Sequence, residues 1–141
     1  MYLINLIFSL SLFGQIPQEK TEVKHDFTIV IHNVKSDEGQ VLINLFNSEE
    51  TFLKKAYSTK VLDAEEGSIS FTFENLPAGN YTAFALHDKN SNGKLDMSKL
   101  GIPNEPYGMS KDGKNRFGPP NFEKSVFTVD ELNNSLEIKL N

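Results

Sequence analysis

The stretch "HDKNSNGKLD" gathers oxygen-bearing residues at spacings that suit a metal ion. The candidate ligands are the side chains of Asp88, Asn90, Asn92 and Asp96 and the main-chain carbonyl of Lys94. A hard cation takes six to eight oxygens, and a tight loop can aim alternate side chains at one point. Gly93 permits the sharp bend. The pattern D-x-N-x-N-G therefore predicts a calcium site of the EF-hand loop type.

The loop departs from the EF-hand pattern in two ways. Lys99 stands where that pattern has its closing glutamate, and the segment before Asp88 reads as a strand rather than a helix. Asp96, or Glu105 from later in the chain, would have to supply the closing carboxylate. With two certain carboxylates and nearby lysines, we expect a dissociation constant of about 10⁻⁴–10⁻³ M, as in extracellular calcium modules.

A plain polar turn is the alternative interpretation of the same residues. Asn and Asp side chains hydrogen-bond to their own backbone in turns, and Asn-Gly, here Asn92 and Gly93, is a strong turn signal. Another metal is a further alternative. The sequence leaves all of these open.

A second feature is the long segment 97–122, which shows no strand or helix periodicity. Its prolines and apolar residues predict an ordered loop, and loops of this length are often functional. In its part 100–122, Tyr107, Arg116 and Phe117 could contact a glycan or a peptide, since aromatic faces stack and arginine donates paired hydrogen bonds. Alternatively, these aromatic rings close one end of the core.

Nothing in the sequence indicates a known catalytic centre. It contains no nucleophile elbow, zinc-protease motif or phosphate-binding loop, and no cysteine. His87 and Asp88 are neighbours on a predicted strand, so their side chains point to opposite faces. We expect a protein that is not an enzyme, with an unrecognised hydrolase using Asp and His groups near His87 as the alternative.

A β framework must position these residues. Alternating or apolar runs predict seven short strands at about 26–34, 40–48, 58–62, 68–75, 81–87, 125–129 and 135–140. Residues 81–87 are apolar on both faces, which is typical of a central strand. Residues 49–57 predict one short helical turn. The class is therefore all-β, an antiparallel immunoglobulin-like β-sandwich.

The N-terminal residues and the net charge indicate where the protein acts and which partners it can have. The apolar run Leu3–Phe13 is too short to span a bilayer and predicts a signal peptide at 1–19, followed by one domain at 20–141. We therefore expect export to the periplasm or the medium, without a membrane span after cleavage. A buried first element and an uncleaved anchor are the alternatives. A net charge of −5 argues against nucleic acid as the partner.

Two sets of residues carry a family resemblance. The turn "FENLPAGNY", residues 73–81, resembles the transthyretin-like and carboxypeptidase-regulatory-like group of sandwiches. With "NVKSDEGQVLINLFNSEETFLK", "LGIPNEPYGMS" and "FGPPNFEKSVF", the chain more closely resembles the bacterial family catalogued as domain of unknown function 2141. This resemblance implies an exported single-domain β-sandwich without assigned activity. The partner, an unknown protein or a glycan, stays open.

Overall fold

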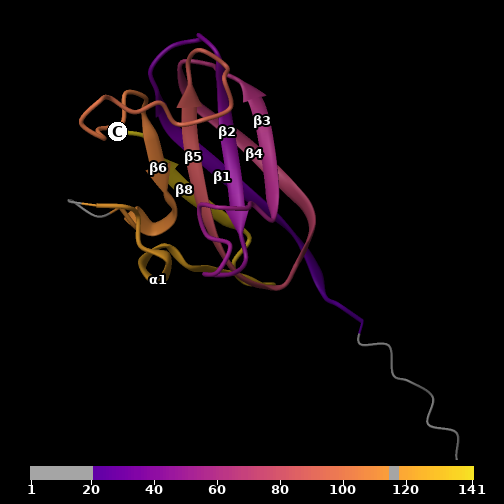
Figure 1. Ribbon diagram of the computed structural model, residues 1–141. Helices are drawn as coiled ribbons and strands as arrows, with labels where there is room; N and C mark the ends of the chain where they lie inside the picture. Colours follow the sequence, from indigo (N-terminus) through magenta and orange to yellow (C-terminus); the bar gives the residue numbers. More distant parts are fainter. Residues whose placement is uncertain (1–20, 115–117) are drawn as a thin grey trace, which may run out of the picture.

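The protein is built from two packed sheets (Figure 1). The computed structural model describes residues 21–114 and 118–141. Its strands are β1 (Lys24–Val34), β2 (Gln40–Phe46), β3 (Ser58–Asp63), β4 (Gly67–Pro77), β5 (Gly79–Asp88), β6 (Tyr107–Met109), β7 (Phe127–Val129) and β8 (Ser135–Lys139). Two short helical segments, η1 (Ser110–Asp112) and α1 (Phe122–Ser125), precede β7. The all-β class expected from the alternating runs is confirmed.

Strand pairing differs from a purely antiparallel sandwich at one place. The smaller sheet has the order β4-β1-β8, and β8 lies parallel to β1. The larger sheet has the order β3-β2-β5-β6, with β7 also paired to β5. Because β7 belongs to the other sheet, β8 reaches β1 by crossing between sheets and not through a hairpin, and this allows the parallel direction.

The main core lies between the two sheets. Alternate residues of each strand point inward, as the period of two along a strand requires. Fully or almost fully buried members include Phe27, Ile29, Ile31, Val41, Ile43, Leu45, Ala83, Ala85, Phe127, Val129 and Ile138. Burying a side chain of the size of Phe or Ile stabilises the fold by about 1.5–3 kcal/mol, so this layer holds the sheets together.

A second apolar cluster covers the outer face of the larger sheet. Leu42, Phe46, Phe84, Leu86 and Met109 are buried there, and Phe52, Ala56, Leu95 and Tyr107 pack against them. The prediction of a central strand at 81–87 is thereby explained, because β5 has a core on each side. The segment after β5 folds back to supply part of this outer layer (Figure 1).

Local structure in two segments departs from the sequence expectations. Residues 49–54 form consecutive turns instead of a helical turn, and Leu53 takes a positive φ of 56° that a helix does not allow. The long segment contains β6, which pairs with β5 although its three residues are too few for alternation to be recognised.

Candidate metal loop and adjoining groove

Asp88, the last residue of β5, is fully buried and anchors the loop. Its Oδ2 accepts hydrogen bonds from Gln40 Nε2 at 2.8 Å and from the Gly93 amide at 2.8 Å. Its Oδ1 accepts from the Asn92 amide at 3.1 Å. Burial raises the pKa of this carboxyl, but the hydrogen bonds outweigh burial and hold the pKa below its ordinary 3.8. Asp88 is therefore a carboxylate at neutral pH.

Gly39 lets the β1–β2 turn approach the loop closely. With its φ of 72°, a Cβ at this position would lie 2.2 Å from the main-chain oxygen of Asp88 and 2.5 Å from that of Lys89. Gln40, the next residue, then reaches the Asp88 carboxylate. The turn around Gly39 was predictable from the sequence, whereas the contact of Gln40 with Asp88 was not, because it depends on the pairing of β2 with β5.

Hydrogen bonds link the four other residues of the predicted ligand set. Asn90 Nδ2 donates to Asp96 Oδ2 at 2.6 Å, and Asn92 Nδ2 donates to both oxygens of Asp96 at 2.9 and 3.0 Å. Lys94 takes part through its amide, which donates to Asn92 Oδ1 at 3.0 Å. Asn92 thus stands between the carboxylates of Asp88 and Asp96, bonded to each.

Glu105 joins the loop from the far side of a hairpin. This buried carboxylate accepts from the Lys89 amide through Oε1 and from the Asp96 amide through Oε2, each at 3.0 Å. The Asn104 amide donates to the Asp96 carbonyl at 2.8 Å, so Asp96 and Asn104 begin and end the hairpin stem. Glu105 is therefore part of the loop's support.

The donor set has the chemistry of a hard-cation site but is satisfied without an ion. The oxygens come from two carboxylates and two amides, which suit calcium. However, amide N–H groups already compensate the charge of Asp96. Within residues 21–114 and 118–141, no three Asp, Glu, His or Cys side chains are arranged to hold a metal. A cation would have to displace the amide hydrogen bonds, which favours weak binding.

His87 does not face Asp88. Its side chain is fully buried, and Nε2 lies 2.9 Å from the carbonyl oxygen of Glu38. Its Nδ1 has no hydrogen-bond partner among the described residues. The Asp88 side chain projects from the opposite face of β5, where it accepts hydrogen bonds from Gln40 and from the Asn92 amide. The two side chains therefore have separate hydrogen-bond partners and do not bond to each other.

Tyr107 lines a groove over the outer apolar cluster. The groove has a volume of about 940 Å³, and its lining residues are Asn44, Phe46, Leu53, Phe84, Leu95, Met97, Leu100, Gly101, Ile102, Pro103, Tyr107, Gly118, Pro119 and Pro120. Leu53, Met97, Leu100 and Ile102 are exposed there. This lining is mostly apolar, and among the described residues Asn44 is its one polar amide side chain.

The ring of Tyr107 has neighbours of its own. It packs against Phe84 with centroids 5.8 Å apart, and Lys114 Nζ lies 4.7 Å from its centroid while donating to its carbonyl at 2.8 Å. Burial lowers the pKa of Lys114, with Asp112 opposing the shift. Of the predicted ligand contacts, Arg116 and Phe117 lie outside the described residues.

Comparisons with known proteins place the chain in a family. No curated protein and no solved structure matches the chain. A family model, described as an uncharacterized protein conserved in bacteria (DUF2141), matches residues 29–137. That range begins within β1, ends within β8 and includes the whole loop and hairpin. The chain therefore belongs to the DUF2141 family of uncharacterized bacterial proteins.

Proposed function

We propose that this protein is an exported, non-catalytic β-sandwich module whose 88–96 loop binds one calcium ion weakly. The observation that carries the proposal is the connection of both carboxylates, Asp88 and Asp96, to Asn92 within one loop. Asn90 and the Lys94 carbonyl complete the proposed set, and Glu105 supports its base. The ion would fasten the exit of β5 to the hairpin that follows.

Thermal unfolding in EDTA and in calcium tests the site. At ten times its dissociation constant, an ion that binds only the folded state adds about 1.4 kcal/mol of stability. For a domain of this size, that free energy raises Tm by roughly 3–7 °C. Asp96→Asn should abolish the rise, and Asp63→Asn, an exposed acid on β3, should retain it. No rise at about 10 mM calcium, well above the expected dissociation constant, would make the loop a polar turn.

Export is tested by expressing the full chain in a bacterium and weighing the product. The apolar run Leu3–Phe13 supports a cleaved signal, so the mature chain should begin near residue 20 and leave the cytoplasm. A full-length cytoplasmic product would contradict this part of the proposal. Within the described ranges, no helix is both long and apolar enough to cross a membrane.

The non-catalytic part of the proposal is supported by the separation of His87 from Asp88. A general base must reach the proton that it removes, and the His87 ring is enclosed with its Nε2 engaged by Glu38. Hydrolysis of p-nitrophenyl esters that disappears in Asp88→Asn, while the variant stays folded, would favour the hydrolase alternative.

A second candidate function is peptide binding at the groove beside Tyr107. The four exposed apolar side chains in its lining favour this candidate, because apolar residues gathered on a soluble surface commonly mark a contact site. They favour a peptide with apolar side chains over a glycan. Fluorescence of the apolar probe 1-anilinonaphthalene-8-sulfonate should rise with the native protein and fall in Leu100→Ser. An unchanged signal in that variant would contradict this candidate.

A further inference from the structure

The open side of the sandwich carries a groove that none of the sequence motifs indicated. β3 and β4 are the edge strands of their sheets, since β3 pairs only with β2 and β4 only with β1. Both edges lie on the same side of the molecule (Figure 1). A groove of about 850 Å³ lies between them. Two unpaired strand edges therefore border one groove.

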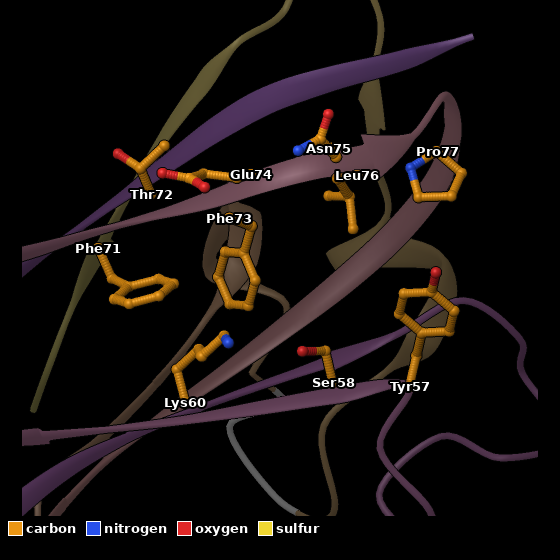
Figure 2. Close-up of a pocket in the computed structure, with 10 residues that line it drawn as sticks. All are labelled: Tyr57, Ser58, Lys60, Phe71, Thr72, Phe73, Glu74, Asn75, Leu76 and Pro77. Atoms are coloured by element: carbon orange, nitrogen blue, oxygen red, sulfur yellow. The ribbon is translucent and has the colours of Figure 1, made fainter. Parts of the chain in front are cut away.

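Side chains from both edges meet in this groove. Figure 2 shows Phe71 and Phe73 projecting from β4 toward Lys60 and Ser58 of β3. The two phenyl rings are 5.0 Å apart in an edge-to-face arrangement. Tyr57 stands at one end, 5.8 Å from the Tyr81 ring. Aromatic rings thus line part of the groove, beside the polar side chains of Ser58, Thr72 and Asn75.

Lys60 is the charged group of the groove that faces inward. Its Nζ lies 5.3 Å from the centroid of the Phe71 ring. Across the part of the chain that the structure describes, the one ion pair joins His32 to Glu137. Glu74 also borders the groove but projects from the other side of β4 (Figure 2). The Lys60 ammonium therefore faces the groove without a carboxylate partner.

We propose that this groove binds an extended peptide that carries an acidic side chain. An unpaired strand edge offers main-chain hydrogen bonds to an added strand, and alternate side chains of that strand give specificity. Phe71, whose ring is half-buried, provides the apolar contact, and Lys60 provides the charge that selects Asp or Glu. Binding a carboxylate would break the cation–π contact of Lys60 with Phe71, and a charge-assisted hydrogen bond to the carboxylate offsets that loss.

The proposed peptide site is separate from the calcium loop and does not depend on it. Lys60 and Phe71 belong to β3 and β4, whereas Asp88 lies at the end of β5. A lysine on an edge strand also discourages pairing with a second copy of the same protein. Self-association is therefore one of the outcomes that the test separates from peptide binding.

The test is a selection of random phage-displayed peptides on the purified protein, with counter-selection on Lys60→Glu. Counter-selection removes peptides that bind elsewhere, including the groove beside Tyr107. We expect enriched peptides with an acidic residue between alternating apolar residues. Their affinity, measured by fluorescence anisotropy, should fall about tenfold or more in Lys60→Glu, and also in Lys60→Met, which keeps the aliphatic stem.

Lys139→Glu is the matched control, because this exposed lysine lies on β8, at the other edge of the smaller sheet. It should leave the affinity unchanged, and peptide binding should slow amide hydrogen exchange in β3 or β4. The proposal is overturned if no peptide is enriched, if binding is equal in Lys60→Glu and wild type, or if protection maps to other strands. Concentration-dependent dimers with no peptide selected would assign the edges to self-association instead.

Discussion

The amide of Asp96 donates a hydrogen bond to Oε2 of Glu105 at 3.0 Å, across the base of the hairpin that follows the loop. The other oxygen of Glu105 accepts from the Lys89 amide at 3.0 Å. One buried carboxylate thus holds both ends of the segment 89–96 against the hairpin stem. The conformation of the candidate metal loop therefore depends on a residue that lies outside it.

Replacing Glu105 with alanine should destabilise the protein by roughly 2–4 kcal/mol, because two amide donors lose their acceptor in a buried place. Urea unfolding measures the change. Glu65→Ala, an exposed glutamate in the β3–β4 turn, is the control and should shift stability little. Amide hydrogen exchange at Lys89 and Asp96 should accelerate in Glu105→Ala, and unchanged protection there would contradict the bridging role.

Asp88 should make folding stability depend on pH on the acid side. Burial raises its pKa, but hydrogen bonds led by that of Gln40 bring the folded pKa below the ordinary 3.8. The stability that the ionised Asp88 contributes is complete above pH 3.8, the ordinary pKa, and is lost as the pH falls through the lower pKa of the folded state. Urea unfolding at decreasing pH should show the wild type losing its advantage over Asp88→Asn.

A second carboxylate provides the comparison for Asp88. Hydrogen bonds from Asn133 also lower the pKa of Asp130, which is exposed at the surface. Asp130→Asn should still lose folding stability at acid pH, because the hydrogen-bonded Asp88 carboxylate is intact in this variant. A constant difference in stability between wild type and Asp88→Asn at every pH would show that the hydrogen bonds do not favour the ionised form of Asp88.

Gly39 and Gly101 form a matched pair for testing the close approach beside Asp88. Their φ angles are 72° and 74°, so alanine meets similar backbone strain at both positions. Only at Gly39 does a Cβ collide with the main-chain oxygens of Asp88 and Lys89, while nothing lies within 4 Å of it at Gly101. Gly39→Ala should therefore lose at least about 1–3 kcal/mol more than Gly101→Ala by urea unfolding. Equal losses of stability in the two variants would mean that backbone strain, and not the collision of the Cβ, causes both.

Tyr81 should titrate late in alkali. Burial, followed by the charges of Tyr57 and Glu22, raises its pKa to about 12. The stability linked to this shift is complete below pH 10, the ordinary pKa, and is lost as the pH rises through about 12. The tyrosinate absorbance of wild type minus that of Tyr81→Phe should have its midpoint near 12. A midpoint near 10 would contradict the buried environment.

The hydroxyl of Tyr81 also has a role at neutral pH. It donates to the Pro77 carbonyl at 2.8 Å, beside the groove between β3 and β4. Tyr81→Phe should lower stability by about 1 kcal/mol, the usual net value of one hydrogen bond. Thr128→Val, which removes an exposed hydroxyl bonded to Asn80, is a suitable control and should cost less.

The sequence by itself determined the features that arise from neighbouring residues. Alternation at period two in Phe27, Ile29 and Ile31 predicted one strand. The apolar faces of residues 81–87 predicted that a second strand, β5, lies at the centre of its sheet. The Asn and Asp spacing predicted a tight loop at 88–96, with a calcium site and a plain polar turn as its two interpretations. These patterns are local, because each follows from the geometry of a few consecutive backbone units.

Only the tertiary structure decided which distant segments meet. The parallel pairing of β8 with β1 and the contact of Gln40 with Asp88 join residues far apart in the chain, and the approach of Lys60 to Phe71 joins the edges of two different sheets. Backbone hydrogen bonds carry no residue identity, so a strand does not specify its neighbour through its own pattern. Burial of both faces of β5 selects the partners, and this selection involves the whole fold at once.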